Sequence, residues 1–114
     1  MIAYHQLLSI MLREVPELRL PFQRLKEEWR SGENPGAHIV LADAVVPFLA
    51  DLLERGHTRV VDRVLVFAEK AVTEGDERVL EAIGQSLIEP MEARPMLLQY
   101  SLGRMGPRLR AFVG

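Results

Sequence analysis

Cysteine is absent from the 114 residues of the chain, so neither a disulfide framework nor a thiolate metal site can form. A chain without cysteine fits a reducing compartment, and we expect a cytoplasmic protein. The longest apolar run, Ala44 to Ala50, contains Pro47 and is far shorter than the roughly 20 residues that a membrane span needs. The N-terminus also lacks the basic start and the apolar core of a signal peptide. We therefore expect neither secretion nor a membrane partner.

Local motifs for catalysis and metal binding are missing as well. His5, His38 and His57 are widely separated, and none has a carboxylate four residues further on, so they form no local metal motif. The four serines lie in no nucleophile-elbow context, and the glycines form neither a P-loop nor a dinucleotide-binding fingerprint. We therefore expect no metal, no cofactor and no enzymatic activity.

Alternation of apolar and polar residues with period two, which is typical of strands, does not occur in the chain. Apolar residues recur instead at spacings of three and four, the pattern of amphipathic helices. Turn residues gather from Ser31 to Ala37, which predicts a loop. Prolines and glycines divide the rest into five to seven helices. The expected ranges are 2–15, 17–29 or 21–29, 37–55, 58–74, 76–91, 95–102 and 107–113.

Prolines shape two of these expectations. The range 37–55 is apolar on nearly every side, which predicts a buried central helix. Pro47 lies within it, and proline removes a backbone donor and crowds the preceding turn, so we expect a kink at 43–46 or a new start near Pro47. Pro90 and Pro95 are expected to mark the break after the fifth helix.

A repeated unit suggests how the helices are arranged. A shift of 19 residues aligns ERGHTRVVDRV (Glu54 to Val64) with TEGDERVLEAI (Thr73 to Ile83), which superposes Gly56 on Gly75. This period equals one helix plus a tight turn and is typical of stacked helices. The chain is long enough for one domain. We predict a single all-α domain (1–114), a right-handed stack of antiparallel helices of the HEAT or armadillo kind.

Charge is spread unevenly, although the formal net charge is only −2. Residues 32–89 carry eleven acidic and five basic side chains, whereas the tail from residue 90 onward carries four basic and one acidic. The acidic middle is either a solvated face or a surface that attracts a basic protein, since complementary fields speed encounter. Four tail arginines without interleaved aromatics predict no nucleic-acid partner. The candidate partner-binding residues are Asp62, Glu69, Glu74, Glu77, Glu81 and Glu89.

Glu69 and Glu89 stand out because each ends an apolar run, at a position where either side chain could be partly buried. They could form a paired-carboxylate active site in a small enzyme or ligand-binding protein. They could also hydrogen-bond the loops and hold the helices together. A general acid and base would need a cleft and an orienting group, and the sequence indicates neither, so we favour the structural role.

A family resemblance adds a concrete function. VLVFAEKAVTEGDERVLEAIGQSLIEPM (Val64 to Met91), followed by LGRMGPRL (Leu102 to Leu109), has a run ending in Glu, a GD turn, a second run ending in Glu and a closing Gly-Pro. This pattern resembles small bacterial helical proteins that look like immunity proteins of polymorphic toxin systems. The resemblance implies a HEAT-like cytoplasmic protein that neutralises a cognate toxin, here a basic domain, by binding it. The alternative is an adaptor that forms a homodimer through Trp29, Phe22 or the Met-rich tail.

Overall fold

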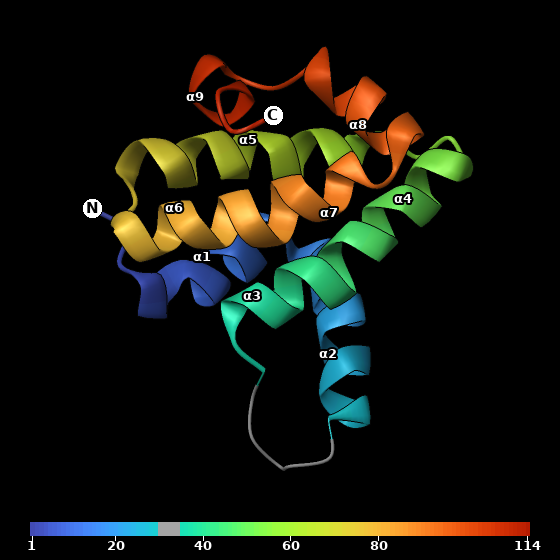
Figure 1. Ribbon diagram of the computed structural model, residues 1–114. Coiled ribbons are helices and arrows are strands. Elements are labelled where there is room, and N and C mark those ends of the chain that lie inside the picture. The colour runs from blue at the N-terminus through green and yellow to red at the C-terminus, as the bar shows by residue number, and fades with distance from the viewer. Residues whose placement is uncertain (30–34) are drawn as a thin grey trace.

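Helices form all the regular secondary structure in the computed structural model, which describes residues 1–29 and 35–114 (Figure 1). They make up seven continuous helical stretches in these residues, within the expected five to seven. The loop expected from Ser31 to Ala37 lies mostly outside the described residues. The segments, with η1 and η2 as 3₁₀ and η3 and η4 as π helices, are η1 Tyr4–Gln6, α1 Leu7–Glu14, η2 Pro16–Leu18, α2 Arg19–Glu28, α3 Ala37–Ile39, η3 Val40–Val45, α4 Val46–Glu54, α5 Arg59–Glu74, α6 Glu77–Ile83, η4 Gly84–Ile88, α7 Glu89–Glu92, α8 Pro95–Leu102 and α9 Pro107–Arg110.

An antiparallel pair of helices forms the middle of the molecule. α5 and the continuous helix α6–η4–α7 run in opposite directions side by side, joined by only Gly75 and Asp76 (Figure 1). Such a short connection leaves antiparallel packing as the natural outcome, as the sequence predicted. α5 contributes seven buried side chains to the core, and these repeat with helical spacing. They are Val61, Val64, Leu65, Phe67, Ala68, Ala71 and Val72.

The continuous helix α3–η3–α4 is buried on several sides, as its apolar sequence predicted. It contacts α2, α5, α6, η4 and α8, so it joins the N-terminal helices to the C-terminal ones. Its core side chains are almost completely removed from water, and burial of this kind is the main source of the fold's stability. They are Ala37, Val40, Leu41, Ala44, Val45, Val46 and Leu49.

Both long helices with an internal proline widen into a π turn just before it. The π segment 40–45 ends two residues before Pro47, and the π segment 84–88 ends two residues before Pro90. A wider turn relieves the crowding that a proline ring causes and tolerates its missing donor. Before Pro47 the helix is irregular in the form of a π turn, and it does not start anew at the proline. The break expected from Pro90 onward lies later, because the π turn lets the helix pass Pro90 and continue to Glu92. The two π segments also contact each other.

The first three residues are extended rather than helical, so the helix expected from residue 2 starts at Tyr4. Ile2 forms a parallel bridge with Gly75. The Ile2 amide donates to the Glu74 carbonyl at 2.7 Å, and the Asp76 amide donates to the Ile2 carbonyl at 3.0 Å. The N-terminal segment therefore fastens the turn between α5 and α6.

The two glycines that the repeat superposed have different roles. Gly56 follows α4 with a positive φ of 77°, a conformation that glycine adopts without strain. Gly75 has an ordinary φ of −83°, but a Cβ there would lie 2.4 Å from the Ala71 carbonyl oxygen and from Val79 Cγ1. Position 56 requires glycine because of its backbone conformation, whereas position 75 requires glycine because there is no space for a Cβ. The repeat therefore marks two helix ends, not two equivalent turns.

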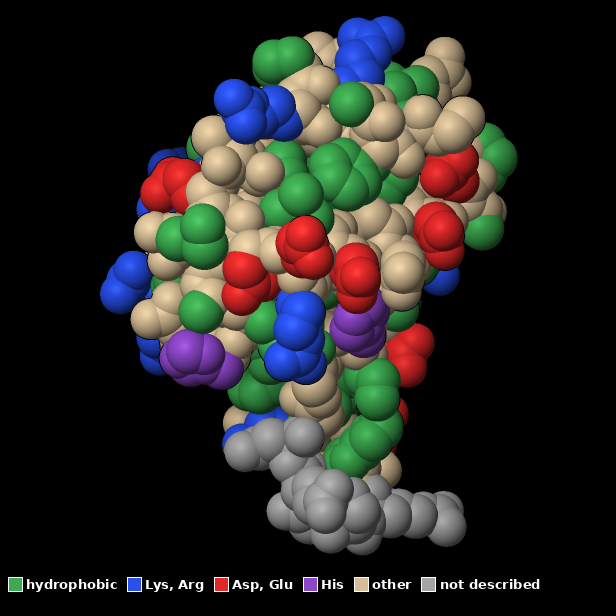
Figure 2. Space-filling model, turned by 60° about the vertical axis from the view of Figure 1, so that its left-hand side comes forward, with side chains coloured by type: hydrophobic (Ala, Val, Ile, Leu, Met, Phe, Trp, Pro, Cys, Tyr) green, Lys and Arg blue, Asp and Glu red, His purple; other side chains and the backbone are tan. Residues whose placement is uncertain are grey.

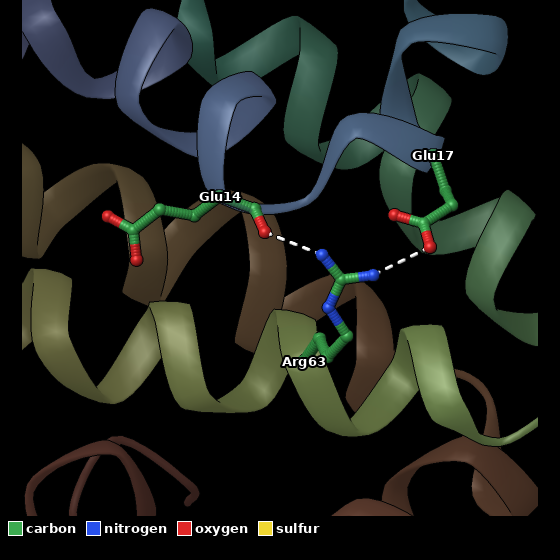
Figure 3. A network of polar contacts seen from close by, with 3 residues as sticks. All are labelled: Glu14, Glu17 and Arg63. Carbon is green, nitrogen blue, oxygen red and sulfur yellow. Dashed lines mark hydrogen bonds and ion pairs between the residues drawn. The ribbon is translucent and has the colours of Figure 1, made fainter.

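A polar network attaches the N-terminal helices to α5 (Figure 3). The Arg63 guanidinium donates to the Glu14 carbonyl at 2.8 Å and to the Glu17 carboxylate at 2.6 Å. Lys70 pairs with the Glu14 carboxylate at 2.8 Å. Arg63 thus bridges two elements with the planar fork that suits such contacts.

Among the described residues, no helix is long and apolar enough to cross a membrane.

Candidate functional site

Asp62 is engaged with α8. Its Oδ1 accepts a hydrogen bond from the Tyr100 hydroxyl at 2.7 Å and lies 3.3 Å from Arg104 Nε. The Arg104 guanidinium also stacks over the Tyr100 ring, 3.8 Å from its centroid. This acidic side chain has partners within the chain, so it is a weak candidate for contact with another protein.

Glu69 fastens the C-terminal segment to α5. Its carboxylate oxygens accept from the Leu109 amide at 2.8 Å and the Arg108 amide at 3.3 Å, which are free donors at the start of α9. A Cβ on Gly106 would lie 2.4 Å from Glu69 Cδ, so this glycine makes room for the carboxylate. Glu69 therefore holds a loop in place, the role that the sequence favoured.

Glu69 and Glu89 have different neighbours. Glu69 contacts α9, whereas Glu89 is exposed and lines a groove on the outer side of α6–α7. No contact between them is found among the described residues, and no three metal-ligating side chains gather in this part of the chain. A paired-carboxylate site is therefore not the arrangement that this geometry supports.

Asp76 is not among the candidates from sequence, yet its carboxylate, like that of Glu69, accepts hydrogen bonds from two backbone amides. Its carboxylate accepts from the Val79 amide at 2.9 Å and the Tyr4 amide at 3.1 Å. It thus caps α6 and holds the N-terminal segment at the same time. The Arg78 guanidinium, 4.2 Å from the Tyr4 ring centroid, lies at the same corner.

The pH dependence of stability should report on this cap. The hydrogen bond from the Val79 amide lowers the pKa of Asp76 below its ordinary 3.8. Backbone hydrogen bonds from Tyr4 and Arg78, and the charge of Arg78, lower this pKa further. Because the pKa is lower in the folded state, the ionised carboxylate stabilises the fold fully at pH values above the pKa of the unfolded state. This contribution disappears as the pH falls through the pKa of the folded state. We expect Asp76→Asn to melt at a lower temperature than the wild type at about pH 6, and the difference to shrink below pH 3.8. A melting difference that stays constant across this range would contradict the role of the charge.

The remaining candidates lie on the outer side of the molecule. Glu74 and Glu77 are exposed at the turn from α5 to α6, and Glu81 and Glu89 are exposed further along the same helix. Figure 2 shows acidic side chains gathered on the side of the molecule where this turn lies, with apolar surface beside them. Four acidic residues repeat along α6–α7 at helical spacings of four, eight and three. We call Glu77, Glu81, Glu89 and Glu92 the acidic stripe.

The acidic stripe has no counter-charge within the described part of the chain. None of the four ion pairs there includes one of its members. Glu77 and Glu81 are like charges four residues apart, a spacing that costs about 0.2–0.5 kcal/mol on a helix surface. Glu89 and Glu92 lie in the last turn of their helix, where the macrodipole disfavours negative charge. Glu77 lies in the first turn of α6, where the dipole favours negative charge, but the like-charge pair and the two glutamates of the last turn weaken the helix.

An open groove of about 430 Å³ lies between the acidic stripe and the C-terminal residues. Leu80, Gly84 and Phe112 form an apolar floor, while Glu81, Glu89 and Glu92 contribute carboxylates around it. We call this the acidic groove. Sequence spacing could have indicated Glu92 as a member of the stripe. It could not indicate Phe112, which reaches the groove only because the C-terminal segment folds back.

His38 also has an unexpected partner. Its Nδ1 lies 2.6 Å from the hydroxyl of Ser86, which is only 5% exposed, and its ring lies 6.1 Å from that of Tyr4. This bond joins α3 to the π segment of the neighbouring helix. The two residues lie 48 positions apart in the chain, so no local sequence pattern indicates this bond.

Fold and site together define an all-α protein with an acidic, grooved outer face. The chain belongs to the family described as Domain of unknown function (DUF7674), whose model matches residues 8–113. No curated protein and no solved structure matches the chain. Because the family description carries no activity, function has to be argued from the site.

Proposed function

We propose that this protein is a cytoplasmic protein-binding module that neutralises a cognate bacterial toxin by direct binding. The observation that carries the proposal is the acidic stripe, four carboxylates on one helix without an ion-pair partner in the described residues. Such a stripe costs stability, and proteins tolerate costs of this kind at sites that serve function. A basic partner would supply the missing counter-charges.

The mechanism we propose is occlusion of the toxin's active site. α5 and α6–η4–α7 are packed against the buried central helix, so they offer a rigid surface whose shape changes little on binding. The field of the acidic stripe steers a basic domain toward this surface and raises the association rate. Both helices lie in a stack that we propose to be right-handed and of the HEAT or armadillo kind.

The family resemblance supports the same surface. The resembling segment from Val64 to Met91 spans most of α5 and nearly all of the helix that bears the acidic stripe. Its two terminal glutamates have separate tasks in the structure. Glu69 holds α9 in place, whereas Glu89 remains exposed and available to a partner.

Co-expression tests the proposal. The product of the adjacent gene is expressed in a host with and without this protein, and growth is measured. We expect growth arrest without the protein, rescue with it, and a co-purifying complex that dissociates as salt rises. If the product of no neighbouring gene is both toxic alone and tolerated together with this protein, the proposal is wrong.

A homodimeric adaptor is the second candidate, and one surface favours it. Met96 is 72% exposed and borders an apolar pocket of about 200 Å³ between α4 and α8, with Ala50, Leu53 and Leu97. Of the residues first considered, Trp29 and Phe22 are partly buried and Met91 is fully buried. Light scattering of the wild type and Met96→Lys decides: a dimer that becomes a monomer in the variant supports the adaptor, and a monomer throughout excludes it.

A further inference from the structure

We propose that the acidic groove receives an apolar side chain from a cationic segment of the partner protein, with arginines or lysines of that segment pairing with Glu81, Glu89 and Glu92. This inference rests on the proposed function and names the contact site within the acidic face. It places the partner on the far half of α6–η4–α7 and not on the turn at Glu74 and Glu77.

The floor of the groove is suited to an apolar side chain. Leu80 and Phe112 are partly buried, so each leaves part of its apolar surface open to the groove. The volume of about 430 Å³ falls in the lower part of the range of roughly 300–1,000 Å³ found for ligand pockets. Aromatic and aliphatic anchors that enter such pockets supply most of the affinity in protein interfaces.

The shape of the groove depends on Gly84 and on the π turn that it begins. A Cβ at Gly84 would lie 2.9 Å from Phe112 Cδ2, so only glycine allows the ring to lie this close to the helix. The π segment then carries the helix past Pro90, which keeps Glu92 on the same continuous helix as Glu81 and Glu89. Without this continuation Glu92 would not follow the other two carboxylates along one helix.

The charges around the groove select the occupant. An apolar anchor that fills the floor would remove water from nearby carboxylates, and removing water from an unpaired carboxylate costs free energy. Arginine or lysine beside the anchor compensates for this loss, whereas a neutral or acidic segment does not. A free apolar ligand lacks the counter-charge, so the groove fits a cationic protein segment.

A peptide titration tests this site on the full chain. The probe is a short synthetic peptide that places one tryptophan between arginine pairs, and its twin has serine in place of tryptophan. Binding is followed through the amide signals of the isotope-labelled protein. We expect shifts concentrated on residues 80–92 and 109–113, and affinity for the serine twin lower by about tenfold, as for loss of an interface anchor.

Two matched variants locate the contact without disturbing the core. Gln85 is exposed in the groove wall and Gln99 is exposed on α8, so each accepts arginine at an exposed helix position. We expect Gln85→Arg to weaken peptide binding by about tenfold through like-charge repulsion, and Gln99→Arg to leave it unchanged.

The outcomes separate this inference from the proposed function. Shifts at the turn of Glu74 and Glu77, equal binding of both peptides, or no peptide binding would overturn the groove assignment. So would shifts that depend on protein concentration alone, since a second copy would then fill the groove. If the Gln85→Arg variant rescues growth as well as the wild type does, the groove assignment is also wrong, while the immunity function stands. Failure of the wild type to rescue would refute that function itself.

Discussion

Replacing Gly75 with alanine is expected to lower the free energy of unfolding by about 2–3 kcal/mol, the largest stability effect that we predict for a single methyl group. The new Cβ would collide with the Ala71 carbonyl and with Val79, and the first of these is backbone that cannot rotate away. Relief requires α5 and α6 to move apart. That movement would also strain the hydrogen bonds that Ile2 makes on either side of Gly75.

Gly103→Ala is the matched control for this prediction. Its Cβ would come no closer than 3.8 Å to the Tyr100 carbonyl oxygen, which is ordinary contact, and its φ of −71° suits alanine. We expect a change within about 0.5 kcal/mol in urea denaturation. If the two alanine variants unfold at the same urea concentration, the tight turn described between α5 and α6 is wrong.

Neutralising the acidic groove should stabilise the protein and damage its function together. The triple variant Glu81→Gln, Glu89→Gln and Glu92→Gln removes a like-charge pair and two charges that oppose the helix dipole. We expect the free energy of unfolding to rise by about 0.5–1 kcal/mol. We also expect association with the cognate toxin to slow by about tenfold, because electrostatic steering is lost. Thermal melts and stopped-flow binding measure the two effects.

A second triple variant separates charge from place. Glu27, Glu28 and Glu54 are exposed, lie in the last turns of their helices, and enter none of the ion pairs among the described residues. Their replacement by glutamine should give a similar gain in stability through the dipole, with unchanged toxin association. Equal slowing by both triples would show that net charge alone, and no particular face, attracts the partner.

Helical periodicity and turn residues were sufficient to predict the all-α class and most helix boundaries. The two-residue connection at Gly75 and Asp76 was readable because a glycine and a capping aspartate follow a complete apolar stripe. The continuation of the helix through Pro90 could not be predicted from the sequence, since a proline inside a helical pattern usually ends the helix. The wider π turn, which contacts the other π segment, lets this helix continue.

The site was predictable only in part. Composition indicated an acidic middle stretch, but it could not separate carboxylates that serve the fold from those that face solvent. Glu69 accepts a hydrogen bond from Leu109, which lies 40 residues later in the chain, and Asp62 accepts one from Tyr100, which lies 38 residues later. Contacts over such distances leave no local pattern. The same reason hid Phe112 and therefore the apolar floor of the groove.

The central claim is that the acidic groove, with the carboxylates of Glu81, Glu89 and Glu92, binds a basic toxin. The most direct measurement is the association rate constant between this protein and the toxin encoded beside it, determined for the wild type and the groove triple variant at low and high salt. We predict a wild-type rate that falls steeply with salt and a variant rate that is about tenfold lower at low salt and nearly salt-independent. Identical rates and identical salt dependence for the two proteins would contradict the claim.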